Sequence, residues 1–310
     1  MRLFRSLDEL PEFQNLVVTQ GTFDGVHRGH VQVLQQVVEQ AAAIGGESML
    51  ITFYPHPRMV LYPNENKLHL LNTIEEKAEL MHKAGIENIL VLPFTDEISK
   101  LTPLDFVRNI LVNKLKVKKM IVGHDHRFGK NREGGLRELQ QFGEMFNFEV
   151  DEIPAWQIEE LAVSSTRIRT ALLEGRIEEA NELLGRPYSF TGTVVHGKKL
   201  GREIGFPTAN IEVFDPYKLI PADGVYAVTC KIGVDKFKAA MNIGWNPTIE
   251  GKGHTIEAHL FDFSGDLYDI AIPFELIARI RDEEKFQNVE ELTQRIRQDV
   301  EQAKIALQHL

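Results

Sequence analysis

Residues 16–46 read LVVTQGTFDGVHRGHVQVLQQVVEQAAAIGG, and this stretch decides the fold of the amino-terminal half. Residues 16–19 are mostly apolar and β-branched, which is typical of a buried strand, and glycines follow in the next few residues. Apolar residues then recur at helical spacing until Gly45 and Gly46 end the pattern; they are Val31, Leu34, Val38 and Ala41. The stretch therefore predicts a buried strand, a glycine-containing loop and an amphipathic helix in direct succession.

The same alternation of strands and helices continues as far as residue 153. Strands are expected at 49–53, 89–92, 119–122 and 148–153, and helices at 74–84, 103–115 and 136–146. This order predicts an α/β domain whose parallel sheet is covered on both faces. Because ligands of such sheets bind beyond the carboxyl ends of the strands, we expect a site in the loops after Thr19, Phe53 and Val122.

The pattern changes in the carboxyl-terminal half. Gly185 and Pro187 form a helix stop signal, so we place a domain boundary there, with domains at 1–184 and 185–310. Short β-branched runs follow at 190–195, 224–231, 237–243, 255–263 and 268–274. They predict a small antiparallel β-barrel or sandwich, and an apolar stripe from Val289 to Ala303 predicts a final helix.

Composition excludes several classes of protein. The 310 residues are 43% apolar and 26% charged, which is ordinary for a globular protein. Lys and Arg total 35 against 45 Asp and Glu, and the formal charge of -10 argues against a dedicated nucleic-acid binder. The single cysteine, Cys230, can form neither an internal disulfide nor a multi-cysteine metal site.

We expect no targeting signal in the sequence as given. Residues 1–9 contain no apolar segment of the kind found in signal peptides. No apolar run reaches the ~18 residues that a membrane span requires. We therefore expect a cytoplasmic protein without a membrane partner, and the sequence leaves its oligomeric state open.

The loop after the first strand carries the strongest chemical signal. His27 and His30 are spaced so that both lie on one side of a helix start, with Gly29 between them. A helix start offers free N–H groups and a positive dipole end, and two imidazoles would complete a cradle for phosphate. A helix with surface histidines is the alternative, but two histidines around a glycine at this junction favour a site.

Three other stretches have two interpretations each. Residues 164–167, Ser-Ser-Thr-Arg, open a helix and are either an anion site or a simple N-cap. Residues 192–202 form a glycine- and cation-rich loop without the GxxxxGK[ST] string, which is either a phosphate loop or a hairpin. Glu257 alternates with apolar residues in a strand, so it faces either a site or solvent.

Several motifs resemble those of one family. Residues 27–30 resemble the HxGH signature of nucleotidyltransferases, and residues 21–30 are similar to the amino-terminal module of bacterial bifunctional riboflavin kinase/FMN adenylyltransferases. Residues 163–169 resemble the second nucleotidyltransferase signature, and residues 53–57 and 123–129 resemble the loops around ATP and flavin. Residues 205–210, GFPTAN, resemble the riboflavin kinase motif. The resemblance covers nearly the whole chain, and it implies a Rossmann-like nucleotidyltransferase domain followed by a riboflavin kinase-like β-barrel with a carboxyl-terminal helix.

The resemblance also implies roles for particular residues. It assigns catalysis to His27 and His30 in the first domain and to Glu257 in the second. It assigns Mg²⁺ and ATP phosphates to Thr208 and Asn210, whose hydroxyl and amide oxygens suit Mg²⁺. The expected remaining ATP or phosphate contacts are Gly21, Phe23, Asp24, Gly29, Ser164, Ser165, Thr166, Arg167, Gly197 and Gly201. The expected flavin contacts are His56, Asp125, Asn246 and Arg281.

The activity implied is a two-step synthesis. Riboflavin would be phosphorylated by ATP to FMN, and FMN would then receive AMP from a second ATP to give FAD and pyrophosphate. The first alternative is an adenylyl- or cytidylyltransferase for another phosphate ester, joined to an unrelated β domain. The second is a flavin-binding regulator without catalysis.

Overall fold

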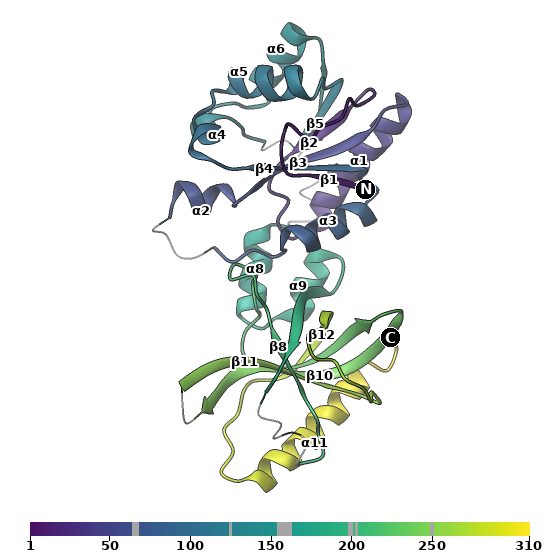
Figure 1. The fold of residues 1–310 in the computed structure, drawn as a ribbon, viewed down its shortest axis with the longest axis vertical. Helices are drawn as coiled ribbons and strands as arrows, with labels where there is room; N and C mark the ends of the chain where they lie inside the picture. The colour runs from purple at the N-terminus through teal and green to yellow at the C-terminus, as the bar shows by residue number, and fades with distance from the viewer. Residues whose placement is uncertain (64–67, 124–125, 154–162, 198–200, 202–203, 249–250) are drawn as a thin grey trace. The chain divides into compact units, whose positions relative to one another are not determined.

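The chain forms two compact units, Met1–Val163 and Ser164–Leu310 (Figure 1). The computed structural model describes residues 1–63, 68–123, 126–153, 163–197, 201, 204–248 and 251–310. In this described part of the chain, no helix is both long and apolar enough to span a bilayer.

A sheet of six parallel strands forms the centre of the first unit, in the order β1-β4-β3-β2-β5-β6. The strands are β1 (Arg2–Phe4), β2 (Val17–Gln20), β3 (Ser48–Tyr54), β4 (Asn88–Pro93), β5 (Lys119–Gly123) and β6 (Glu149–Ile153). Because β3 and β5 lie on either side of β2, the strand order reverses at β2, where sheets of this type bind ligands. The α/β prediction is confirmed, with β1 as an additional strand.

Helices cover both faces of this sheet (Figure 1). Side chains alternate along the strands, so Val17 and Leu50 enter one core while Val18 and Met49 enter the other. The first core is covered by α1 (Arg28–Ala43) and α3 (Ile74–Lys83), and the second by α5 (Pro103–Phe106), the π-helical η1 (Val107–Lys114) and α6 (Leu136–Phe146). Short helices lie in the connections: α2 (Pro57–Leu61), α4 (Asp96–Lys100) and η2 (Lys130–Arg132).

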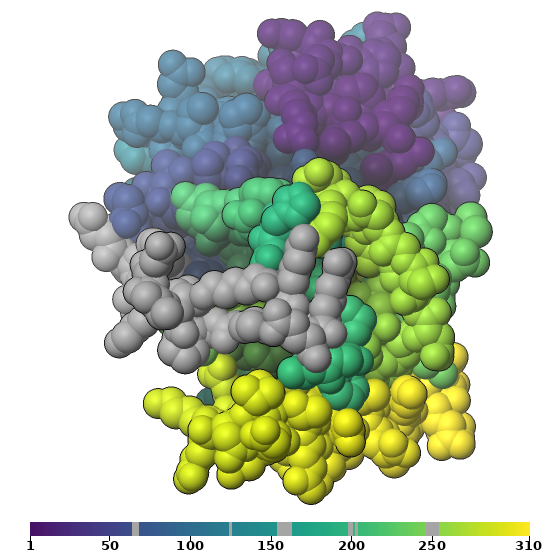
Figure 2. Space-filling view, turned by 60° about the horizontal axis from the view of Figure 1, so that its bottom comes forward, coloured from purple at the N-terminus to yellow at the C-terminus, as the bar shows by residue number. Residues whose placement is uncertain are grey.

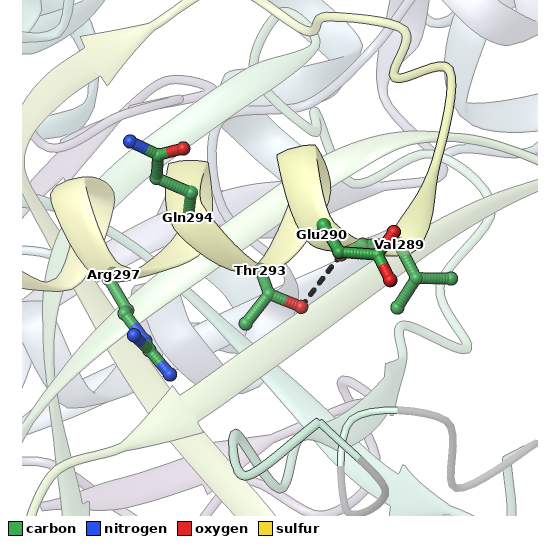
Figure 3. Close-up of a pocket in the computed structure, with 5 residues that line it drawn as sticks. All are labelled: Val289, Glu290, Thr293, Gln294 and Arg297. Carbon is green, nitrogen blue, oxygen red and sulfur yellow. Dashed lines mark hydrogen bonds between the residues drawn. The ribbon is translucent and has the colours of Figure 1, made fainter.

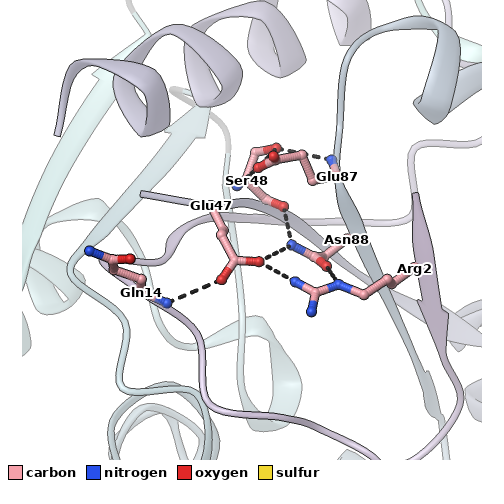
Figure 4. A network of polar contacts seen from close by, with 6 residues as sticks. All are labelled: Arg2, Gln14, Glu47, Ser48, Glu87 and Asn88. Atoms are coloured by element: carbon pink, nitrogen blue, oxygen red, sulfur yellow. Dashed lines mark hydrogen bonds and ion pairs between the residues drawn. The ribbon is translucent and has the colours of Figure 1, made fainter. Parts of the chain in front are cut away.

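A polar network joins the amino-terminal ends of three strands, at the edge opposite the expected site (Figure 4). Arg2 of β1 donates from Nε to Asn88 Oδ1 at 2.8 Å and forms an ion pair with Glu47. Asn88 is fully buried and donates from Nδ2 to the Ser48 carbonyl at 3.1 Å, while Glu87 accepts from the Ser48 N–H at 2.9 Å. These contacts fix the register of β1, β3 and β4.

A closed antiparallel barrel forms the centre of the second unit, in the order β10-β11-β8-β7-β12-β9. The strands are β7 (Tyr188–Val195), β8 (Ala209–Glu212), β9 (Gly224–Ile232), β10 (Asp235–Thr248), β11 (Gly251–Leu260) and β12 (Ala271–Arg281). Large aromatic residues fill its interior, and the rings of Phe190 and Phe274 lie 6.0 Å apart. The expected barrel is confirmed, and β8 is a short strand that the sequence analysis did not separate from its loop.

Two helices precede the barrel within the same unit. These are α8 (Ser165–Leu173) and α9 (Ile177–Leu184), and α9 packs against β7 and β12. Asn181 of α9 accepts from the Tyr188 N–H at 2.7 Å and donates to the Leu276 carbonyl at 2.9 Å. The helix that ends at Gly185 therefore belongs to the barrel unit, and a division of function at residue 184 stays a prediction.

The final helix, α11 (Val289–Ala306), packs against β9, β10 and β12 of the barrel. Its exposed atoms are the yellow ones in Figure 2. Ala303 and Leu307 are buried against residues of the barrel that include Ala227 and Phe261. The first turn of the helix is exposed to solvent, and Val289 is 57% exposed. Only part of the apolar stripe predicted from Val289 to Ala303 is therefore buried in the core.

Cys230 lies inside β9 and is buried. Burial disfavours the charged thiolate and raises the pKa of the Cys230 thiol to about 12. The cysteine is thus a small core residue.

Candidate active sites

The turn between β2 and α1 carries the first candidate site. Its backbone is tightly bent, with left-handed φ values of 44° at Phe23, 91° at Gly25 and 41° at Val26. His27 is the N-cap of α1, and its Nδ1 accepts from the backbone N–H of His30 at 3.3 Å. The two imidazole rings stack at 3.6 Å between centroids, so the structure brings both predicted histidines together at the carboxyl end of β2.

His30 is held as a neutral imidazole. Burial, the neighbouring His27 and the positive charge of Lys77 hold the pKa of His30 well below its ordinary value. Its Nδ1 is buried without a hydrogen-bond partner among the described residues. A phosphate that reached this atom would supply the missing partner, and its negative charge would raise the pKa of His30.

Asp24 stabilises the turn through hydrogen bonds from the backbone of a distant segment. Its carboxylate is buried and accepts from the Leu71 N–H at 2.9 Å and from the Asn72 N–H at 3.3 Å. These contacts tie the turn to the segment that leads into α3. Direct contact of Asp24 with phosphate stays a prediction. Repulsion between a carboxylate and an anion argues against that contact.

The loops after β3 and β5 reach the same edge of the sheet as the turn after β2, because these strands are parallel neighbours. His56 caps α2, and its Nδ1 accepts from the Arg58 N–H at 3.1 Å. Asp125, the other expected flavin residue of this unit, lies outside the described residues.

The second nucleotidyltransferase signature opens α8 in the barrel unit. Ser164 is the N-cap, and its hydroxyl accepts from the Arg167 N–H at 3.2 Å. The Arg167 guanidinium donates to Glu179 Oε1 from Nε at 3.1 Å and from Nη2 at 3.0 Å. The N-cap is confirmed, and the contact of Ser165, Thr166 and Arg167 with pyrophosphate stays a prediction.

The second candidate site lies on two neighbouring strands of the barrel, β8 and β11 (Figure 1). The Thr208 hydroxyl donates to Glu257 Oε2 at 3.0 Å, and Asn210 pairs with Glu257 across the strands. A carboxylate, a hydroxyl and an amide are thereby assembled from segments about fifty residues apart.

Two glycines bring backbone against these side chains. A Cβ on Gly197 would lie 2.0 Å from Asn210 Nδ2, and one on Gly201 would lie 2.3 Å from the Phe206 carbonyl oxygen. Neither position has room for a side chain, so the main chain itself approaches the Thr208–Asn210 segment. Such a close backbone is what a phosphate-binding loop requires.

The oxygen atoms at this second site suit Mg²⁺, because Thr208, Asn210 and Glu257 all present hard donors. Within the residues that the structure describes, no group of three or more His, Cys, Asp or Glu side chains could hold a metal ion. A Mg²⁺ ion here would therefore depend on hydroxyl and amide oxygens and on the phosphates of ATP.

Two further expected flavin residues lie on β10 and β12. Asn246 pairs with Gly253 at the β10–β11 end of the sheet. Arg281 makes a two-point ion pair with Asp299 of α11, with N–O distances of 2.9 and 2.7 Å; the Asp299 side chain is buried, and that of Arg281 is 10% exposed. The structure thus gives Arg281 a role in holding α11, and flavin contact by either residue stays a prediction.

A cavity of about 500 Å³ opens beside the first turns of α11 (Figure 3). It is lined by Val289, Glu290, Thr293, Gln294 and Arg297. None of the predicted site residues lines it, and it carries no assignment.

The sequence analysis did not single out Lys77, a buried cation of α3. A signal was present, because Lys77 shares the helix face of Ile74, Ala78 and Met81, where an apolar residue is expected. A lysine on the apolar face of a helix near a candidate phosphate loop therefore predicts a buried polar contact, as a histidine in the loop does.

Two family models match the chain in succession. The model described as FAD synthetase matches residues 10–167, and the model described as riboflavin kinase matches residues 184–307. Each model covers one of the two candidate sites, and together they span both units.

Curated relatives match over nearly the whole chain. A protein of Listeria monocytogenes named bifunctional riboflavin kinase/FMN adenylyltransferase is 39% identical to this chain, over 92% of this chain and 90% of the relative. A protein of the same name from Escherichia coli K12 is 35% identical to this chain, over 96% of each chain. A crystal structure described as a macrolide-efflux protein from Streptococcus pneumoniae shares the fold, with a TM-score of 0.87 and 31% identity over 97% of this chain and 98% of that one. The chain belongs to the family of bifunctional riboflavin kinase/FMN adenylyltransferases.

Proposed function

We propose that the barrel phosphorylates riboflavin with ATP to give FMN, and that the first unit uses a second ATP to convert FMN into FAD and pyrophosphate. The observation that carries the proposal is the assembly of Thr208, Asn210 and Glu257 on one barrel, in a chain whose other unit pairs His27 with His30. We also propose that the enzyme acts in the cytoplasm.

In the kinase step, Glu257 accepts the proton of the terminal ribityl hydroxyl as that oxygen attacks the γ-phosphorus of ATP. The bond from the γ-phosphorus to the bridging oxygen breaks, and ADP leaves. Thr208 and Asn210 would hold Mg²⁺, which neutralises phosphate charge when it is bound. The hydrogen bond from Thr208 orients the Glu257 carboxylate before substrate arrives.

In the adenylyl transfer step, a phosphate oxygen of FMN attacks the α-phosphorus of ATP, and pyrophosphate leaves. No enzyme nucleophile is required, so the protein acts by alignment and by stabilising charge. His27 and His30 stabilise charge on the reacting phosphates, with the α1 amino terminus behind them. Ser164, Ser165, Thr166 and Arg167 bind the departing pyrophosphate.

Product analysis tests this function directly. Purified protein is incubated with riboflavin, ATP and Mg²⁺, and FMN, FAD, ADP and pyrophosphate are measured over time. We expect FMN to appear first and FAD to follow, and a chelator to stop FMN formation. Failure to form FMN or FAD, with nucleotidyl transfer to another phosphate ester, would favour the first alternative, and bound flavin without turnover would favour a regulator.

A further inference from the structure

Lys77 is an unusual buried cation in the first unit. The residue is only 6% exposed, and it sits on α3 beside Ile74 and Ala78 in the apolar core. Lysine is almost never buried in this way unless its ammonium group is paired. Its Nζ donates to the backbone carbonyl of Thr22 at 2.7 Å, so the side chain crosses from the helix to the turn before α1.

Thr22 lies at the start of the bent segment that carries the histidines. Three of the next four residues have left-handed φ values, and for the non-glycine residues Phe23 and Val26 this conformation is costly unless their surroundings hold it. The Thr22 carbonyl also lies 3.4 Å from the Thr52 hydroxyl, a weaker contact from β3. The hydrogen bond from Lys77 therefore holds the start of the bent turn that leads directly into His27.

The ammonium group of Lys77 interacts electrostatically with both Asp24 and His30. The carboxylate of Asp24 opposes the effect of burial on Lys77, while burial still leaves the pKa of Lys77 lower than usual. On the other side, Lys77 and His27 both disfavour a proton on His30. The charges that lower the pKa of His30 thus come from His27, the N-cap of α1, and from Lys77 of α3, and the Asp24 carboxylate acts on Lys77.

We infer that Lys77 is a positioning residue for adenylyl transfer, which fixes the turn through the Thr22 carbonyl and thereby sets where His27 and His30 meet the triphosphate. The inference rests on the proposed function of the first unit. Misplacement of reacting groups by about 1 Å can cost about 100-fold in rate, so loss of this hydrogen bond should be visible in turnover.

The test compares variants of the full-length chain. Lys77→Met removes the charge and keeps the apolar stem, Lys77→Arg keeps a charge that can reach a carbonyl, and Lys83→Met is the control at an exposed position of the same helix. We expect Lys77→Met to lower kcat for FAD formation from FMN by about 100-fold, with a smaller change in KM for ATP, and Lys77→Arg to recover at least part of that loss. Riboflavin phosphorylation by the barrel serves as an internal standard and should not change.

A second measurement does not depend on turnover. The imidazole of His30 is titrated by NMR, and its signal is assigned by its loss in His30→Gln. Removal of the Lys77 charge should raise the pKa of His30 toward its ordinary value in Lys77→Met, and Lys77→Arg should leave it low. An unchanged His30 pKa in Lys77→Met would show that the Lys77 charge does not act on His30.

The outcomes separate the two proposals. A folded Lys77→Met with unchanged kcat and an unchanged His30 titration overturns the role of Lys77. If Lys77→Met does not fold, Lys77→Gln takes its place; if neither neutral variant folds while Lys77→Arg has full activity, the role is structural and the inference fails. A wild-type protein that makes no FAD overturns the proposed function instead, and the His30 titration then still shows whether Lys77 acts on that residue.

Discussion

Glu257 is the residue on which the kinase proposal depends most directly. Replacing it with glutamine keeps the size of the side chain and its contact with Thr208 but removes the base. Because a positioned general base contributes about 10²- to 10⁴-fold, Glu257→Gln should lower the rate of FMN formation by at least about 100-fold. Chromatography of the flavin products measures this rate.

The matched control is Glu212→Gln, an exposed glutamate of the neighbouring strand β8. It should leave both activities unchanged, and Glu257→Gln should still make FAD from added FMN. Wild-type FMN formation by Glu257→Gln would remove Glu257 from the mechanism.

His30 gives a pH dependence whose sign follows from its burial. Its pKa is lowered in the folded state, so below about pH 6.5 the unfolded chain binds a proton at His30 that the folded chain does not. Stability therefore falls as pH drops through this range, by up to about 1.4 kcal/mol per pH unit from this residue. Urea unfolding at pH 7.5 and 5.5 should show a smaller acid loss for His30→Gln than for wild type.

His82→Gln, at an exposed histidine of α3, is the comparison for that experiment and should behave as wild type. An acid loss that is equal in wild type and His30→Gln would contradict the picture of a buried neutral imidazole.

At the level of elements, the sequence predicted the long strands and helices well and the short elements poorly. Residues 16–46 folded as expected because the apolar period is sustained over four turns of helix. β1 and β8 have only three and four residues, and such short strands are specified by their neighbours in the sheet. Ser164 was recognised as a cap, whereas Lys77 was not singled out because its hydrogen-bond partner lies in a turn far away in sequence.

The attachment of α11 to the barrel gives a prediction at this scale. Asp299 is buried against the Arg281 guanidinium, with the Arg295 Nε 3.6 Å away. Asp299→Ala would leave a buried cation without its partner, which typically costs about 3–5 kcal/mol. Chemical denaturation of the full chain, with the unfolding of the barrel followed separately, measures the change.

Glu301→Ala, at an exposed position of the same helix, should cost much less. Equal destabilisation by both substitutions would show that helix propensity, and not the buried ion pair, holds α11.

On the scale of the whole molecule, the proposed function gives the two sites one shared intermediate. FMN is the product of one site and the substrate of the other, so a chain with only one working site can supply or consume it. A mixture of Glu257→Gln and His30→Ala should therefore make FAD from riboflavin, although neither variant does so alone. Time courses for each variant and for the mixture test this, and failure of the mixture would indicate that FMN passes within one molecule.

At this scale the sequence predicted both folds, because the pattern of strands and helices changes along the chain. The roles of the site residues stay predictions. The composition of each site from distant segments, such as Thr208 against Glu257, became visible only in the structure. The same holds for the two-point ion pair of Arg281, since nothing in the local sequence indicates which carboxylate it meets.

The buried thiol in β9 has a practical consequence for studying how the units work together. With a pKa of about 12, Cys230 carries almost no thiolate near neutral pH, so maleimide reagents should react with it very slowly. Cys230 therefore does not need to be removed before other positions are labelled through engineered cysteines. One engineered cysteine in each unit would accept a donor and an acceptor dye, and energy transfer between the dyes would follow their separation while flavin is processed.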